Sequence, residues 1–122
     1  KLSELAIGIG PFVVGPSVER KIGTSAFSAM SINATKWFDA NWAREKGLYT
    51  EVFDTIEEMD IEINKLASTL SKSNPEAMEE LKNIMWKGTD DWDTLLIDRA
   101  KSSGKLVLSN FTKKAIENFK KK

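Results

Sequence analysis

The sequence contains neither cysteine nor histidine among its 122 residues. This double absence excludes a disulfide framework, a zinc site with Cys or His ligands, a thiol nucleophile and a Ser–His triad within the chain. Any proton transfer therefore depends on Asp, Glu, Lys or the single tyrosine, Tyr49. The absence of cysteine is compatible with a reducing compartment.

Long apolar runs and an excess of one charge are also missing. No apolar run approaches the ~20 residues that cross a bilayer, and the first residues do not resemble a signal peptide. Eighteen basic and eighteen acidic residues cancel, so no global field attracts nucleic acid or an anionic membrane. We therefore expect a cytoplasmic globular protein with neither nucleic acid nor a membrane as its partner.

The residues that are present predict a mainly helical chain with minor β structure. Apolar residues make up 41% of the sequence, enough for one domain with a modest core. Residues 5–10 form a short apolar run that is typical of a buried strand or an extended loop, although two glycines weaken it. Residues 48–54, rich in branched and aromatic side chains, are the best strand candidate.

Capping residues and glycines predict where the helices begin and end. Asp39 suits an N-cap, and Thr55 with Glu58 has the spacing of a capping box. Pro75 suits the first turn of a helix, and Gly104 suits a helix end. The helices predicted in this way cover residues 17–23, 24–34, 40–46, 56–70, 75–87, 90–104 and about 109 onward.

Apolar side chains repeat at helical spacing in the predicted helix at 56–70. Its stripe consists of Ile56, Met59, Ile63, Leu66 and Leu70. Such a stripe usually packs in the core of the protein, so we expect an internal seam here and no cofactor site. The four tryptophans also indicate burial, in the core or at a subunit interface.

Three motifs in order resemble the C-terminal half of the enoyl-CoA hydratase/isomerase (crotonase) family, over essentially the whole chain. The first is an acid before an apolar xxGxxP stretch and a short helix ending in Gly, here Glu4, Gly8, Pro11 and "VERKIG". The second is Ala-x-x-Ala-x-x-x-Gly-Leu before a strand, here "ANWAREKGL". The third is a C-terminal helix, here with Phe111, Lys114, Asn118 and Phe119.

The resemblance implies the C-terminal helical half of a crotonase-like ββα-spiral α/β fold. Residues 1–54 would form the end of the spiral core, and residues 55–122 a helical region for oligomerisation and CoA contact. The family forms homotrimers or hexamers that are dimers of trimers. Its oxyanion hole and first catalytic glutamate precede the position of Glu4. The chain is therefore interpreted as a truncated or proteolysed enzyme, inactive by itself.

The resemblance also implies roles for four residues. Glu4 would be the carboxylate that helps deliver a proton to the α-carbon of an acyl-CoA, and its alternative is a surface residue near a terminus. Phe12 would line the active site or simply pack in the core. Phe111 and Lys114 would contact the adenine and the phosphates of CoA, or be a core residue and a solvated lysine. No metal is implied, and no cofactor besides the CoA that the substrate carries.

Two departures from the family pattern keep the reaction open. Ser3 replaces the usual proline, and Phe12, Val13 and Val14 replace a glycine-rich run. We predict a hydratase that adds water to, or removes it from, an acyl-CoA thioester in fatty-acid or branched-chain amino-acid breakdown. The alternatives are an isomerase or another CoA-thioester lyase of the same fold, or a non-catalytic helical interaction domain if the chain is complete.

Overall fold

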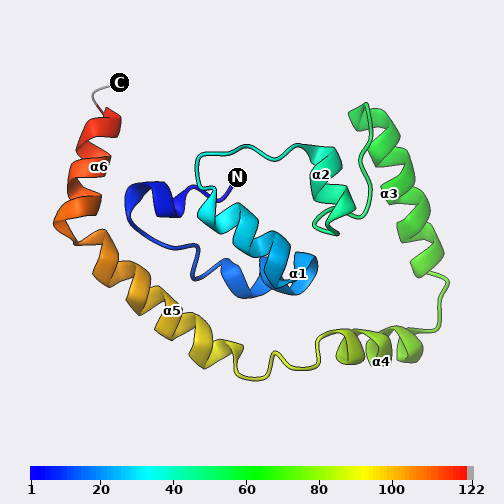
Figure 1. Cartoon of the computed structure of the whole chain (residues 1–122). Coiled ribbons are helices and arrows are strands. Elements are labelled where there is room, and N and C mark those ends of the chain that lie inside the picture. The colour runs from blue at the N-terminus through cyan, green and yellow to red at the C-terminus, as the bar shows by residue number, and fades with distance from the viewer. Residues whose placement is uncertain (121–122) are drawn as a thin grey trace. The chain divides into compact units, whose positions relative to one another are not determined.

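The computed structural model describes residues 1–120, and all regular secondary structure in this part of the chain is helical (Figure 1). The mainly helical prediction is thus confirmed. The elements in order are the 3₁₀ helix η1 (Glu4–Ile7) and the α-helices α1 (Gly15–Ile32), α2 (Ala40–Glu45), α3 (Ile56–Leu70), α4 (Pro75–Met85), α5 (Trp92–Val107) and α6 (Asn110–Lys120).

Neither predicted strand forms within residues 1–120. Glu4–Ile7 winds into η1, which ends where Gly8 adopts a left-handed conformation with φ of 84°. Residues 48–54 contain neither helix nor strand. A strand needs a neighbour to accept its backbone hydrogen bonds. The described chain offers no second strand, so branched and aromatic composition alone did not produce a sheet.

The predicted N-caps are confirmed. The Asp39 carboxylate accepts a hydrogen bond from the Trp42 N–H at 2.8 Å. At the start of α3, the Thr55 hydroxyl accepts from the Glu58 N–H at 3.2 Å, and the Glu58 carboxylate accepts from the Thr55 N–H at 3.3 Å. These bonds satisfy backbone donors that have no partner inside the helix.

Glycines end helices at only some of the predicted positions. Gly23, with φ of 73° and ψ of 161°, interrupts α1 as expected. Gly104 does not end α5, which continues to Val107, so that predicted boundary is wrong. A glycine can remain in a helix at a cost of ~1 kcal/mol relative to alanine. The chain leaves α5 three residues later, where the Ser109 N–H donates to the Leu106 carbonyl at 3.0 Å.

The chain divides into two compact units. Unit 1 comprises Lys1–Thr50 together with the chain from Asp93 onward, and unit 2 comprises Glu51–Trp92. The core of unit 1 lies on one face of α1, where Ile22, Ala26 and Met30 are buried. Partly buried apolar side chains pack around them: Leu2, Val18, Phe27, Phe38, Trp42 and Leu48.

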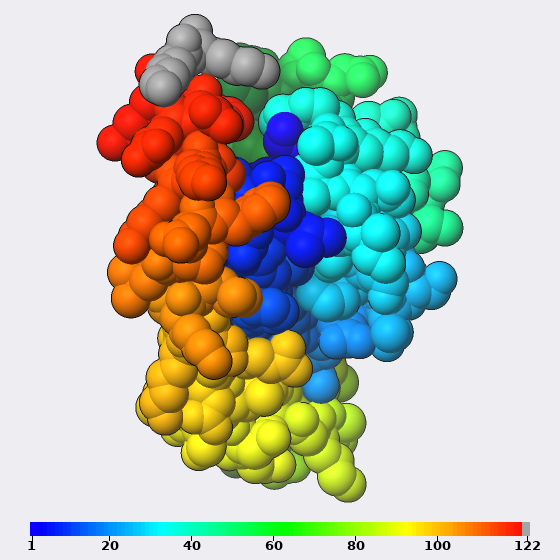
Figure 2. Space-filling view, turned by 60° about the vertical axis from the view of Figure 1, so that its left-hand side comes forward, coloured from blue at the N-terminus to red at the C-terminus, as the bar shows by residue number. Residues whose placement is uncertain are grey.

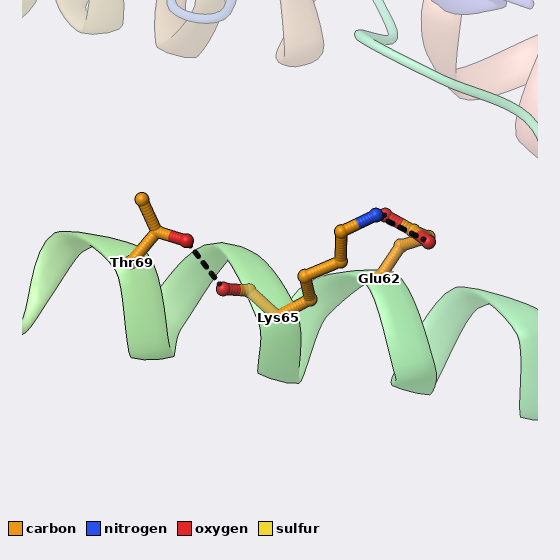
Figure 3. A network of polar contacts seen from close by, with 3 residues as sticks. All are labelled: Glu62, Lys65 and Thr69. Atoms are coloured by element: carbon orange, nitrogen blue, oxygen red, sulfur yellow. Dashed lines mark hydrogen bonds and ion pairs between the residues drawn. The ribbon is translucent and has the colours of Figure 1, made fainter.

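Unit 2 has no comparable core. None of the residues of α3 or α4, all of which the structure describes, is buried. Ile56 is 70% exposed and Leu66 is 60% exposed, so the prediction that this stripe forms an internal seam is wrong for unit 2. Contacts within α3 include the Lys65–Glu62 ion pair at 3.2 Å (Figure 3).

The tryptophans differ in their surroundings. Trp42 packs on the core of unit 1, whereas Trp37 is exposed beneath the Lys1 ammonium, 4.5 Å from the ring centroid. Trp86 and Trp92 flank the connection between α4 and α5 and meet edge to face, with ring centroids 6.0 Å apart. The expectation of general burial therefore holds for Trp42 and not for Trp37.

Within residues 1–120, no helix combines the length and the apolar character that crossing a membrane requires.

Candidate active site

Glu4 is the first residue of η1, and its side chain is half-buried. Its Oε2 atom is fully buried, and no donor in the described part of the chain makes a hydrogen bond to it. Burying a polar oxygen without a partner costs free energy, on the order of 1–3 kcal/mol. Such an atom is unusual in a folded protein and marks a position where a bound group could supply the missing contact.

The 3₁₀ conformation fixes the backbone that carries this carboxylate. The Ile9 N–H donates to the Glu4 carbonyl at 3.0 Å, and the Gly8 N–H donates to the Leu5 carbonyl at 3.1 Å. The left-handed Gly8 closes the turn, a conformation that glycine adopts without steric cost. Glu4 therefore stands on a short, closed turn rather than on a loose terminal segment.

Gly8 also brings η1 against α6, which is more than a hundred residues away in the sequence. A Cβ at Gly8 would overlap the ring of Phe111 and lie 2.9 Å from the Thr112 hydroxyl oxygen. Only glycine permits this close approach. Figure 2 shows the N-terminal segment in blue lying directly against the orange and red residues of α6.

Phe111 thus lies beside the turn that carries Glu4. Its ring contacts Gly8 on one side, and the residue is still 66% exposed. Phe111 is therefore not a core residue, which was the alternative considered for it. An aromatic ring that is held on one face and open on the other can stack on a planar ligand.

Thr112 is the residue of this region that sequence reasoning missed. It is 0% exposed, whereas its neighbours Phe111 and Lys113 are exposed. The Ser109 hydroxyl accepts from the Thr112 N–H at 3.2 Å and donates to the Thr112 hydroxyl at 3.1 Å. The helix-starting Ser109 was the only signal in the sequence, and nothing local indicated that Gly8 would bury this threonine.

Phe12 does not join the core cluster. Its half-buried ring folds back over Gly10, where a Cβ would overlap the ring, and its N–H donates to the Gly10 carbonyl at 2.7 Å. A glycine is thus needed at position 10 for the ring to come this close to the backbone. No contact described for residues 1–120 joins Phe12 to Glu4, so its place in the pocket stays a prediction.

Lys114 is exposed and lies one turn after Phe111 on α6. Residues three apart are neighbours on a helix surface, so an ammonium and an aromatic ring can serve one ligand here. The structure gives Lys114 no described contact with Glu4. The predicted residues are thus brought together in part, with Glu4 and Phe111 joined through Gly8.

The chemistry available at this site is that of one carboxyl group. Among residues 1–120, no group of three or more acidic side chains is close enough together to hold a metal ion. A half-buried carboxyl group can donate a proton to, or accept one from, an adjacent carbon or oxygen atom. It cannot by itself hold a developing oxyanion, which needs fixed N–H donors or a cation.

No protein-family model matches this chain, and no curated protein or solved structure matches it either.

Proposed function

We propose that this chain is the C-terminal half of a crotonase-like enoyl-CoA hydratase in which Glu4 handles a proton at the α-carbon. The observation that carries the proposal is the buried Oε2 atom of Glu4, which no described donor contacts. Its position at the head of η1 agrees with the place of the acid in the family motif. The contact of Gly8 with Phe111 adds an aromatic surface beside it.

The reaction adds water across the α,β double bond of an enoyl thioester. The oxygen of water bonds to the β-carbon, and a proton is delivered to the α-carbon, where Glu4 acts. Negative charge that develops on the thioester oxygen needs two fixed N–H donors. In the family these donors and the other carboxylate precede the position of Glu4, so the proposal concerns the complete gene product.

The same proposal assigns the CoA moiety to α6. The open face of Phe111 would stack on the adenine, and the Lys114 ammonium would pair with a phosphate. We further propose a cytoplasmic homotrimer, or a hexamer built from two trimers, that uses no cofactor besides the CoA carried by the substrate. The C-terminal half of the crotonase spiral fold would then be completed by residues outside this sequence.

Replacement of Glu4 by glutamine in the complete gene product tests the proposal. We expect Glu4→Gln to lower the hydration rate of a trans-2-enoyl-CoA about 10²–10⁴-fold, because the amide cannot exchange the proton. CoA binding should persist. Glu45→Gln, on the exposed end of α2, is the matched control and should leave the rate unchanged. Full activity of Glu4→Gln would remove Glu4 from the mechanism.

An isomerase of the same fold is the second candidate. Phe12, Val13 and Val14 replace the glycine-rich run that follows the proline in the family, and this bulk would change the space beside the reacting carbons. An isomerase moves a proton from one carbon to another and needs no bound water. Turnover of a 3-enoyl-CoA in place of a trans-2-enoyl-CoA would favour it. Absence of both activities in the complete protein would favour a helical interaction domain instead.

A further inference from the structure

The zero net charge of this protein is the sum of two strongly charged parts. Unit 2 contains eleven acidic and four basic residues, whereas the rest of the sequence contains seven acidic and fourteen basic residues. The two parts therefore carry formal charges of −7 and +7. Charge separation on this scale steers association between complementary surfaces.

The acidic part also presents an uncovered apolar face on a helix. Ile56, Met59, Ile63, Leu66 and Leu70 line α3 and are all exposed. Their steps of three and four residues match the seam positions of a helix that packs lengthwise on another helix. Asp60 and Glu62 occupy the positions directly beside this seam, where interhelical ion pairs form.

A shallow recess extends the apolar surface at the start of α3. It has a volume of about 280 Å³ and is lined by Phe53, Glu58, Ile61 and Glu62. The Phe53 ring suits the apolar stem of a lysine side chain, and its ammonium could pair with Glu62 in exchange for the exposed Lys65. Glu62 borders both the recess and the seam, so the acidic and apolar features of α3 form one continuous surface.

The chain itself contains a helix of complementary character. Helix α6 carries Lys113, Ile116 and Lys120 along one line, at steps of three and four. Phe119, at 78%, is among the most exposed apolar residues of the protein. The contact with η1 covers α6 around Thr112, whereas Lys113 and Lys120 are exposed and Ile116 is 37% exposed.

We propose that the acidic apolar face of α3 binds the basic face of α6 in a second copy of this chain. Charge complementarity favours this occupant, because α3 has four acidic residues and one lysine, whereas α6 combines apolar side chains with three lysines and one acidic residue. The contact joins different surfaces of two copies, so it is made twice in a reciprocal pair, closes into a ring or extends into an open filament. The proposal is based on the charges and the exposure of α3 and α6, and it does not depend on the proposed enzymatic function.

A charge exchange between two variants tests this contact. One variant, Asp60→Lys with Glu62→Lys, makes the α3 face basic; the other, Lys113→Glu with Lys120→Glu, makes the α6 face acidic. Each variant alone then opposes like charges, and we expect its self-association to weaken at least about tenfold. In an equimolar mixture the basic α3 face meets the acidic α6 face, so association should return to within about threefold of the original.

Sedimentation equilibrium over a range of protein concentrations, at about 0.05 M and about 0.5 M salt, provides the measurement. The unchanged chain should associate more weakly at the higher salt concentration. Arg44→Glu with Lys46→Glu, on exposed positions of α2 and its end, changes the net charge equally and is the matched control. It should associate as the unchanged chain does, and far-ultraviolet circular dichroism should show that all variants keep their helices.

Three results would overturn the proposal. The mass of a monomer at every concentration would show that a second copy does not cover α3 and would leave it to the same chain or to another protein. Association that neither reversal weakens would show that the contact uses other surfaces. Failure of the mixture to recover, with both variants folded, would show that α3 and α6 do not meet.

Discussion

In unit 1, Ile22, Ala26 and Met30 repeat at four-residue steps and are buried, whereas in unit 2 the equally regular stripe of α3 is exposed. Both stripes satisfy the same periodicity rule for an amphipathic helix. They differ in what lies beside them, since α1 meets apolar side chains from the N-terminal segment, from α2 and from Leu48. Periodicity therefore identifies an apolar helix face that can be buried. Long-range contacts decide whether other residues of this chain bury it.

Truncation of one residue in each stripe gives the largest expected contrast. Met30→Ala should cost about 2–5 kcal/mol of unfolding free energy, because it opens a cavity in a packed core. Ile63→Ala should change the free energy of unfolding by less than about 0.5 kcal/mol in dilute solution, where its side chain already contacts water. Amide hydrogen exchange of α1 and α3 measures both values.

Equal losses for the two variants would show that the same chain covers α3 in solution. If a second copy covers α3 as proposed, the cost of Ile63→Ala should increase with protein concentration, because only the associated form buries this side chain. The cost of Met30→Ala should not vary with protein concentration in that way.

Two glycines with a left-handed backbone conformation, one in each unit, allow a matched comparison in which the expected effect on stability is intermediate. Gly8 and Gly88 have φ of 84° and 82°, so alanine costs each about 1–2 kcal/mol of backbone strain. A Cβ at Gly8 also overlaps Phe111, whereas Gly88 has no other atom within 4 Å of this position. Gly8→Ala should therefore cost at least about 1 kcal/mol more than Gly88→Ala.

Urea unfolding of the two glycine variants measures this difference, and amide exchange of α6 locates its cause. Faster exchange in α6 is expected for Gly8→Ala alone, since only this variant disturbs the contact with η1. Equal effects of the two substitutions would mean that α6 does not rest on Gly8.

Removal of one N-cap from each unit gives the smallest expected effect, about 1 kcal/mol per helix. Thr55→Ala removes the cap of α3, a helix without buried residues, so the loss should appear as unfolding of its first turns. Ser109→Ala removes the cap of α6, but the contact of Thr112 with Gly8 should keep that helix formed. Backbone carbon chemical shifts of the two helices distinguish these responses, and equal fraying of α3 and α6 would contradict the comparison.

Local chemistry predicted much of the helical structure. The caps at Asp39 and Thr55 and the break at Gly23 appear where the sequence placed them, because each depends on residues within one turn. The predictions of a strand at 48–54 and of a helix end at Gly104 are wrong. A strand depends on a distant neighbour, and a glycine ends a helix only when the chain turns there.

The residues of the candidate site were also predictable only in part. A resemblance of motifs singled out Glu4 and Phe111, but no local pattern predicted that Gly8 would bring their segments together. The buried Thr112 had no signal beyond the helix start at Ser109. Contacts between residues more than a hundred positions apart depend on the whole chain. Local periodicity in the sequence therefore does not predict them.

The contact between Gly8 and Thr112 also sets an order of events during synthesis. A ribosome that adds about 5–20 residues each second needs several seconds to pass from one partner to the other. Until α6 emerges, η1 and Gly8 lack the surface against which they pack. The turn that carries Glu4 is therefore made about a hundred residues before the helix against which it packs, and it is accessible to chaperones during this delay.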